Sequence, residues 1–66
     1  MLSNTERLTI FYQTTKLARD LDIDLTGWQL VRASQAIGNG QESDPAKVLR
    51  LVAPTQFANA TFAPED

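Results

Sequence analysis

The chain contains no cysteine and no histidine in its 66 residues. Without cysteine it can form neither a disulfide nor a thiolate metal site, and without histidine it lacks a common zinc ligand and general base. A glycine-rich phosphate loop is also missing. Nucleophilic and phosphoryl-transfer mechanisms therefore lack their usual residues. We expect no enzymatic activity, no metal and no cofactor.

Long apolar runs are absent as well. No stretch of the sequence approaches the roughly 18 consecutive apolar residues that a membrane-spanning helix requires. The first residues carry no basic segment followed by an apolar run, which is the pattern of a signal peptide. We therefore expect no membrane span, no signal peptide and a cytoplasmic location.

Positive charge is scarce and scattered. Six lysine and arginine residues stand against eight aspartate and glutamate residues, which gives a net charge of −2 at pH 7. A surface that binds nucleic acid needs clustered cations, because the release of counterions supplies much of the affinity. Nucleic acid is therefore not the favoured partner.

Large apolar side chains are few, because aromatic residues make up 8% of the chain and much of the rest of the apolar content is alanine. The length predicts one domain, over residues 1–66. A chain this short buries only about 60% of its unfolded surface, so its stability is marginal without a disulfide or a metal. We expect the core to be completed by docking on another protein, or on a second copy of the chain in a homodimer.

A capping box predicts the first helix, over residues 4–21. The hydroxyl of Ser3 is placed to accept the N–H of Glu6, whose carboxylate reaches back to the N–H of Ser3. Residues 8–15 are rich in β-branched and aromatic side chains, which favour a strand instead. The cap, and the helix-favouring residues that follow this stretch, lead us to expect a helix.

A second capping box, formed by Thr26 and Gln29, predicts a helix that runs to about Ile37. Residues 38–40 contain two glycines and an asparagine, which tolerate the left-handed conformation of a helix end. The inward side of this helix is predicted to consist of Leu30, Ser34 and Ile37, with Val31 and Ala33 at its edges.

A third, short helix is predicted over residues 46–52, with Asp44 as its cap and Pro45 at its first position. Its predicted buried side consists of Val48, Leu49, Leu51 and Val52. Residues 54–66 lack a clear period, and we expect an irregular, partly packed segment in which Phe57 folds back onto the helices and the last two residues fray. The sequence therefore predicts an all-α fold, a three-helix domain in which a helical hairpin carries the short third helix.

Three alternating acidic residues, Asp20, Asp22 and Asp24, imitate the first half of a calcium-binding loop. The sixth position of such a loop needs glycine and holds Leu25, and the twelfth needs glutamate and holds Val31. We interpret this stretch as an acidic connection before the second helix, whose positive end favours carboxylates.

Trp28 projects away from the predicted inward side of the second helix, at helical spacing from Arg32 and Gln35. Tryptophan and arginine are the residue types enriched at the energetic centres of protein interfaces. The alternative is that Trp28 packs on the first helix or under the C-terminal segment, with Arg32 stacked on its ring. The predicted partner-binding residues are Phe11 and Tyr12 from the first helix, and Trp28, Val31, Arg32 and Gln35 from the second.

The favoured function is a non-enzymatic protein-interaction module, a small regulator, inhibitor or subunit that binds a larger protein through a helical apolar patch. The alternative is a small DNA-binding transcription regulator of helix-turn-helix type that uses Arg32, Lys47 and Arg50. Residues 38–44 are longer than the usual turn of three to four residues in that motif. The third helix is also mostly apolar, whereas a recognition helix places polar side chains on the bases.

Overall fold

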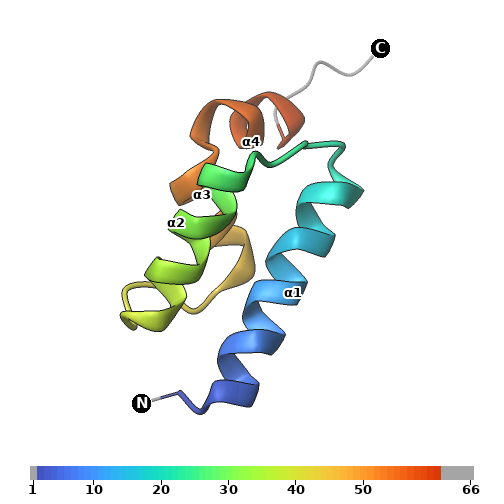
Figure 1. Ribbon diagram of the computed structural model, residues 1–66. Helices are drawn as coiled ribbons and strands as arrows, with labels where there is room; N and C mark the ends of the chain where they lie inside the picture. Colours follow the sequence, from blue (N-terminus) through green and yellow to red (C-terminus); the bar gives the residue numbers. More distant parts are fainter. Residues whose placement is uncertain (1, 62–66) are drawn as a thin grey trace.

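The computed structural model describes residues 2–61, and its first helix begins at the predicted cap (Figure 1). Helix α1 spans Asn4–Asp20. The hydroxyl of Ser3 accepts a hydrogen bond from the backbone N–H of Glu6 at 3.1 Å, and the Glu6 carboxylate accepts one from the N–H of Ser3 at 2.9 Å. The capping box and the helix are confirmed, and the strand alternative for residues 8–15 is wrong.

Helix α2 spans Gly27–Gly38, between the predicted cap at Thr26 and the predicted helix end at residues 38–40. The N–H of Gln29 donates to the Thr26 hydroxyl at 3.2 Å, and the N–H of Thr26 donates to the Gln29 side chain at 2.9 Å. Beyond the helix, Gly40 has a φ of 72° and its N–H donates to the carbonyl of Ile37 at 3.1 Å. A residue without a Cβ adopts this left-handed conformation without strain, so the predicted helix end is confirmed.

Helix α1 also ends at a residue in the left-handed conformation, but here that residue is an aspartate. Asp22 has a φ of 61°, and its N–H donates to the carbonyl of Arg19 at 3.0 Å. The N–H of Ile23 donates to the carbonyl of Ala18 at 2.7 Å, which completes the pair of hydrogen bonds typical of this motif. The acidic stretch therefore closes α1 as well as leading into α2.

Helix α3 spans Pro45–Val52, and the Asp44 carboxylate caps it by accepting from the N–H of Ala46 at 3.4 Å. Its buried residues are Val48, Leu49 and Val52. Leu51 was expected among them, and this prediction is wrong, because its side chain is 39% exposed. At 100° per residue Leu51 lies roughly 100° from the centre of the buried strip.

A fourth helix, α4, spans Pro54–Thr61 within the segment that was expected to be irregular. Ala53 leaves the helical conformation, with φ −139° and ψ 61°, so α3 ends before Pro54. The fixed φ of proline suits the first position of a new helix, and the carbonyl of Ala53 accepts the N–H of Phe57 at 2.9 Å. Phe57 packs against the core, as predicted. The predictions for the last two residues lie outside the described residues.

The helices pack as the predicted hairpin with a third helix against it. Helices α1 and α2 run in opposite directions, and α3 contacts both of them and α4 (Figure 1). The all-α fold class is confirmed over the described residues. None of the helices in this part of the chain combines the length and the apolar character needed to cross a membrane.

The core is built from small side chains. Its largest fully buried members are Leu49, Val48 and Thr14. The hydroxyl of Thr14 donates to the carbonyl of Ile10 at 2.8 Å, so this buried polar group is hydrogen-bonded. The other buried apolar residues are Ala18, Ile23, Ala33, Ala36, Ile37, Val52 and Ala53. Every aromatic side chain of the described residues is at least partly exposed.

The inward side of α2 differs from the predicted one. Ala33, Ala36 and Ile37 are buried, whereas Leu30 is half-buried and Ser34 is exposed. Ile37 is inward as predicted, whereas the other inward positions are taken by the two alanines instead of Leu30 and Ser34. With these residues inward, Trp28, the largest side chain of α2, lies in solvent.

Candidate protein-binding surface

The outward side of α2 carries four of the predicted binding residues. Trp28 is 69% exposed, Val31 is 46% exposed, and Arg32 and Gln35 are exposed. These residues lie three, four and seven positions apart, so they are neighbours on one side of the helix. They extend over two turns, roughly 10 Å along the axis. We call these four residues the α2 surface.

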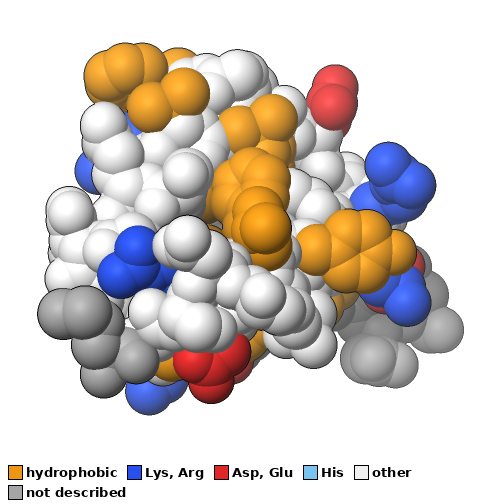
Figure 2. Space-filling view, turned by 60° about the horizontal axis from the view of Figure 1, so that its bottom comes forward, with side chains coloured by type: hydrophobic (Ala, Val, Ile, Leu, Met, Phe, Trp, Pro, Cys, Tyr) orange, Lys and Arg blue, Asp and Glu red, His pale blue; other side chains and the backbone are white. Residues whose placement is uncertain are grey.

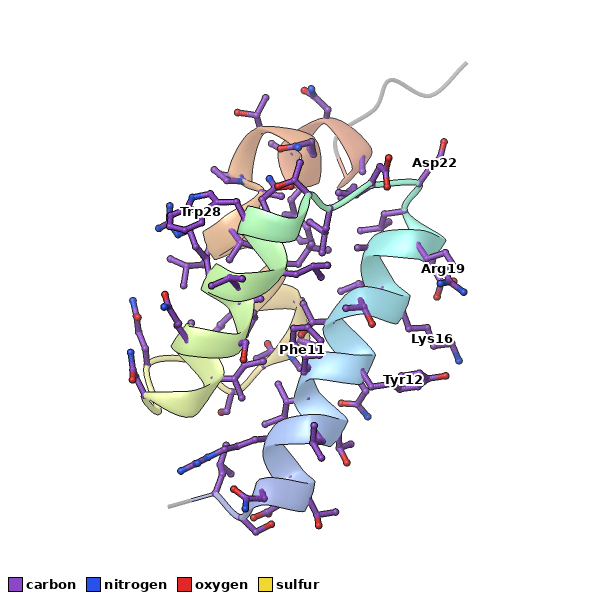
Figure 3. The ribbon with its side chains drawn as sticks, viewed as in Figure 1. Phe11, Tyr12, Lys16, Arg19, Asp22 and Trp28 are labelled. Atoms are coloured by element: carbon purple, nitrogen blue, oxygen red, sulfur yellow. The ribbon has the colours of Figure 1, made fainter. Side chains whose placement is uncertain are left out.

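The other two predicted residues lie elsewhere. Tyr12 is 66% exposed on α1 and points away from α2, in the direction opposite to Trp28 (Figure 3). Phe11 is half-buried, packs against the core and points to the space between α1 and α2. The six residues therefore do not form a single patch. The exposed fraction of Trp28 is also too large for a ring packed on α1 or under another segment.

Leu8 is an exposed apolar residue that was not selected from the sequence. Its side chain is 69% exposed, as much as that of Trp28. It precedes Tyr12 by four positions, a spacing that makes the two residues neighbours on α1. That spacing could have identified it. Leu8 and Tyr12 form a second exposed apolar stripe, which we call the α1 pair.

A hollow separates α1 from α2 near the beginning of α1. Figure 2 shows hydrophobic side chains gathered in a band on one face of the molecule, with polar surface on both sides. The Nε atom of Arg7 is buried without a hydrogen-bond partner beside this hollow. The lining residues are Arg7, Leu8, Phe11, Ser34, Ile37 and Gly38.

Charge is unevenly distributed over the helices. Helices α2, α3 and α4 contain Arg32, Lys47 and Arg50 and no acidic residue. All three cations are exposed. The acidic residues belong to α1, to the connections between helices and to the end of the sequence. These three helices therefore contain three cations and no anion, while carboxylates flank them: Asp44 caps α3, and Asp22 and Asp24 line a pocket with residues of α4.

Several carboxylates support the backbone. The Glu42 carboxylate accepts hydrogen bonds from the N–H groups of Ser43, at 3.0 Å, and Asp44, at 3.4 Å. Asp22 and Asp24 are exposed and line a pocket with Arg19. Among residues 2–61, no three acidic side chains are grouped closely enough to hold a metal ion.

Comparisons with protein-family models, with curated proteins and with solved structures gave no match. The functional assignment therefore rests on the residues of this chain and on their arrangement.

Proposed function

We propose that this protein is a non-enzymatic interaction module that acts in the cytoplasm as a small regulator, inhibitor or subunit. It binds a larger protein, and the α2 surface forms the centre of the contact. Trp28 supplies the apolar anchor, Val31 extends it, and Arg32 and Gln35 supply polar contacts at its edge.

One observation carries this proposal: the largest side chain of the molecule lies in solvent, while alanine, valine, leucine and isoleucine fill the core. The 69% of the Trp28 side chain that lies in water is roughly 170 Å² left unburied, worth about 4 kcal/mol at 25 cal/mol per Å². A tryptophan beside an exposed arginine is also the composition found at the energetic centre of protein interfaces. Both points favour a surface that is covered when the protein acts.

The test is affinity capture from the native host, with the bound proteins identified by mass spectrometry. Trp28 and Tyr12 are matched, because both are exposed aromatic residues, at 69% and 66%, on opposite sides of the molecule. Trp28→Ala should weaken the captured complex by more than about 30-fold, the effect of a residue worth at least 2 kcal/mol. Tyr12→Ala should leave it within about threefold.

Circular dichroism of both variants must show that they are folded. If Tyr12→Ala abolishes capture and Trp28→Ala does not, the α1 pair is the binding surface and our assignment is wrong. If neither substitution affects capture, neither helix face is the interface.

DNA binding is the second candidate function, and the three exposed cations of α2 and α3 favour it. These cations are Arg32, Lys47 and Arg50. Three phosphate contacts correspond to a slope of about −2.7 in log K against log salt concentration, so binding would fall about 40-fold between 50 and 200 mM salt. Retention on heparin at physiological salt would favour this candidate over the protein-interaction module.

A further inference from the structure

The exposed side chains of the α2 surface are arranged in ridges that could pack against another helix. Trp28 and Arg32 are four positions apart, and so are Val31 and Gln35, so the four exposed side chains form two parallel rows. Rows at this spacing are the ridges that interdigitate when two helices pack, and they favour a crossing angle of roughly −50°. A helix from a partner can therefore place one ridge of apolar side chains between the two rows.

The charge around this site selects the partner. Arg32 is the single charged residue of α2 and it is exposed on the α2 surface. Helix α3 contains Lys47 and Arg50 and no acidic residue, and helix α4 contains no charged residue. A helix docked here therefore meets the exposed guanidinium of Arg32, which no acidic residue of α2 neutralises. Acidic residues along the edge of the docked helix would supply the complementary charge, whereas basic residues would be repelled.

A second copy of the chain fits this site poorly. In a two-fold symmetric dimer each residue of the α2 surface faces the same surface of the other copy. Arg32 lies near the middle of the span from Trp28 to Gln35, so antiparallel pairing would bring the two Arg32 side chains close to the symmetry axis. No acidic residue on α2 offsets that repulsion. The same positive charge that disfavours a copy of this chain favours an acidic helix.

We propose that the occupant of the α2 surface is an amphipathic helix of another protein, with an apolar stripe flanked by aspartate or glutamate. Its stripe packs over Trp28 and Val31, and its carboxylates pair with Arg32. This inference rests on the proposed function and adds the chemistry of the partner to it.

The experiment uses a displayed library of helical peptides. Each peptide carries a fixed stripe of leucines, and the positions beside the stripe are randomised among glutamate, glutamine and lysine. Selection against the full chain should enrich glutamate beside the stripe, and a selected acidic peptide should bind about five- to tenfold more weakly to Arg32→Glu than to the wild type. Selection against Arg32→Glu should shift the enrichment toward lysine.

Arg19→Glu is the matched control, because Arg19 is also exposed and the substitution changes the net charge equally, but Arg19 lies on α1 (Figure 3). It should leave the enrichment and the affinity unchanged. If Arg19→Glu weakens binding as much as Arg32→Glu, the effect is one of overall charge and the inference is overturned.

The outcomes separate this inference from the proposed function. Peptides that need Trp28 but show no preference for glutamate would refute the acidic partner and leave the interaction module intact. Peptides whose binding is unaffected by Trp28→Ala would refute the α2 surface itself. Self-association in sedimentation experiments that Trp28→Ala abolishes would overturn the inference in favour of a homodimer. Heparin retention that Arg32→Glu abolishes, without glutamate enrichment, would overturn it in favour of nucleic acid.

Discussion

Replacing the largest side chain of this protein should matter less for stability than replacing a leucine. Trp28 is 69% exposed, whereas Leu49 is completely buried. If stability followed side-chain size alone, Trp28→Ala would be the more damaging substitution. The structure predicts the opposite order.

The magnitudes follow from the buried areas. With 69% of its surface in solvent, a tryptophan of about 250 Å² buries roughly 80 Å², worth about 2 kcal/mol at 25 cal/mol per Å². This value is an upper limit, because the unfolded chain already buries part of that area. Alanine also favours a helix by about 0.5 kcal/mol over tryptophan. We therefore expect Trp28→Ala to lower the free energy of unfolding by at most about 1.5 kcal/mol.

The substitution Leu49→Ala removes a side chain with 0% exposure from the centre of the core. A buried leucine replaced by alanine typically costs 2–5 kcal/mol, because contacts are lost and a cavity remains. The core of a domain this small rarely supplies more than about 3–5 kcal/mol of stability. Leu49→Ala should therefore have a free energy of unfolding near zero, with folded and unfolded protein both populated at room temperature, while Trp28→Ala stays folded.

Urea unfolding followed by far-ultraviolet circular dichroism measures both free energies without depending on Trp28 fluorescence. A loss of 3 kcal/mol or more for Trp28→Ala, the usual cost of removing a buried tryptophan, would refute the reasoning. It would place the indole in the core and remove the anchor of the α2 surface.

Three further predictions concern single positions. Thr14→Val should change the free energy of unfolding by less than about 0.5 kcal/mol, because the buried hydroxyl bonds only to the Ile10 carbonyl within α1; Thr14→Ser should cost about 1 kcal/mol through its lost methyl group, and urea unfolding compares the two. Asp22→Gly should raise the melting temperature by about 4 °C, because glycine adopts the φ of 61° at this position without steric strain. Gly40→Ala should lower the melting temperature by a similar amount, because alanine would be strained at the φ of 72°. A shift of the melting temperature in the same direction for both variants would contradict this explanation. Arg7→Met should stabilise the fold by up to about 1 kcal/mol in urea unfolding, because the buried Nε of Arg7 has no hydrogen-bond partner; a clear loss of stability would mean that the Nε is hydrogen-bonded in solution.

The helix boundaries were predictable because local chemistry determines them. Ser3 and Thr26 each belong to a capping box that needs only a second side chain three residues later, and the structure contains both. Gly40 could be assigned to the end of α2 for a similarly local reason. Asp22 was harder to identify, because aspartate adopts a positive φ only where the surrounding chain requires it.

The orientation of the helices was less predictable, because it depends on packing between distant segments. Alanine adds little weight to a pattern of large apolar side chains, yet Ala33 and Ala36 are both buried. Ser34 and Leu51 were assigned to the buried sides, but the packing of α2 and α3 leaves both exposed. The outward position of Trp28 followed from helical spacing alone.

The composition of the candidate site was predictable only in part. Helical periodicity grouped Trp28 with Val31, Arg32 and Gln35, because all four belong to one helix. No local rule could place Tyr12 relative to Trp28, since that requires the packing of α1 against α2. The fold therefore separates onto two surfaces the residues that the sequence grouped into one.

The account depends on an indole that remains in solvent when the chain is folded and alone. Trp28 is the single tryptophan of the chain, so quenching of its fluorescence by acrylamide measures its exposure directly. We predict a quenching rate constant near that of a fully exposed indole in a small peptide, unchanged when the protein is diluted from high to low micromolar concentration. Strong protection that persists at the lowest concentration would show that Trp28 belongs to the interior, and would contradict the account.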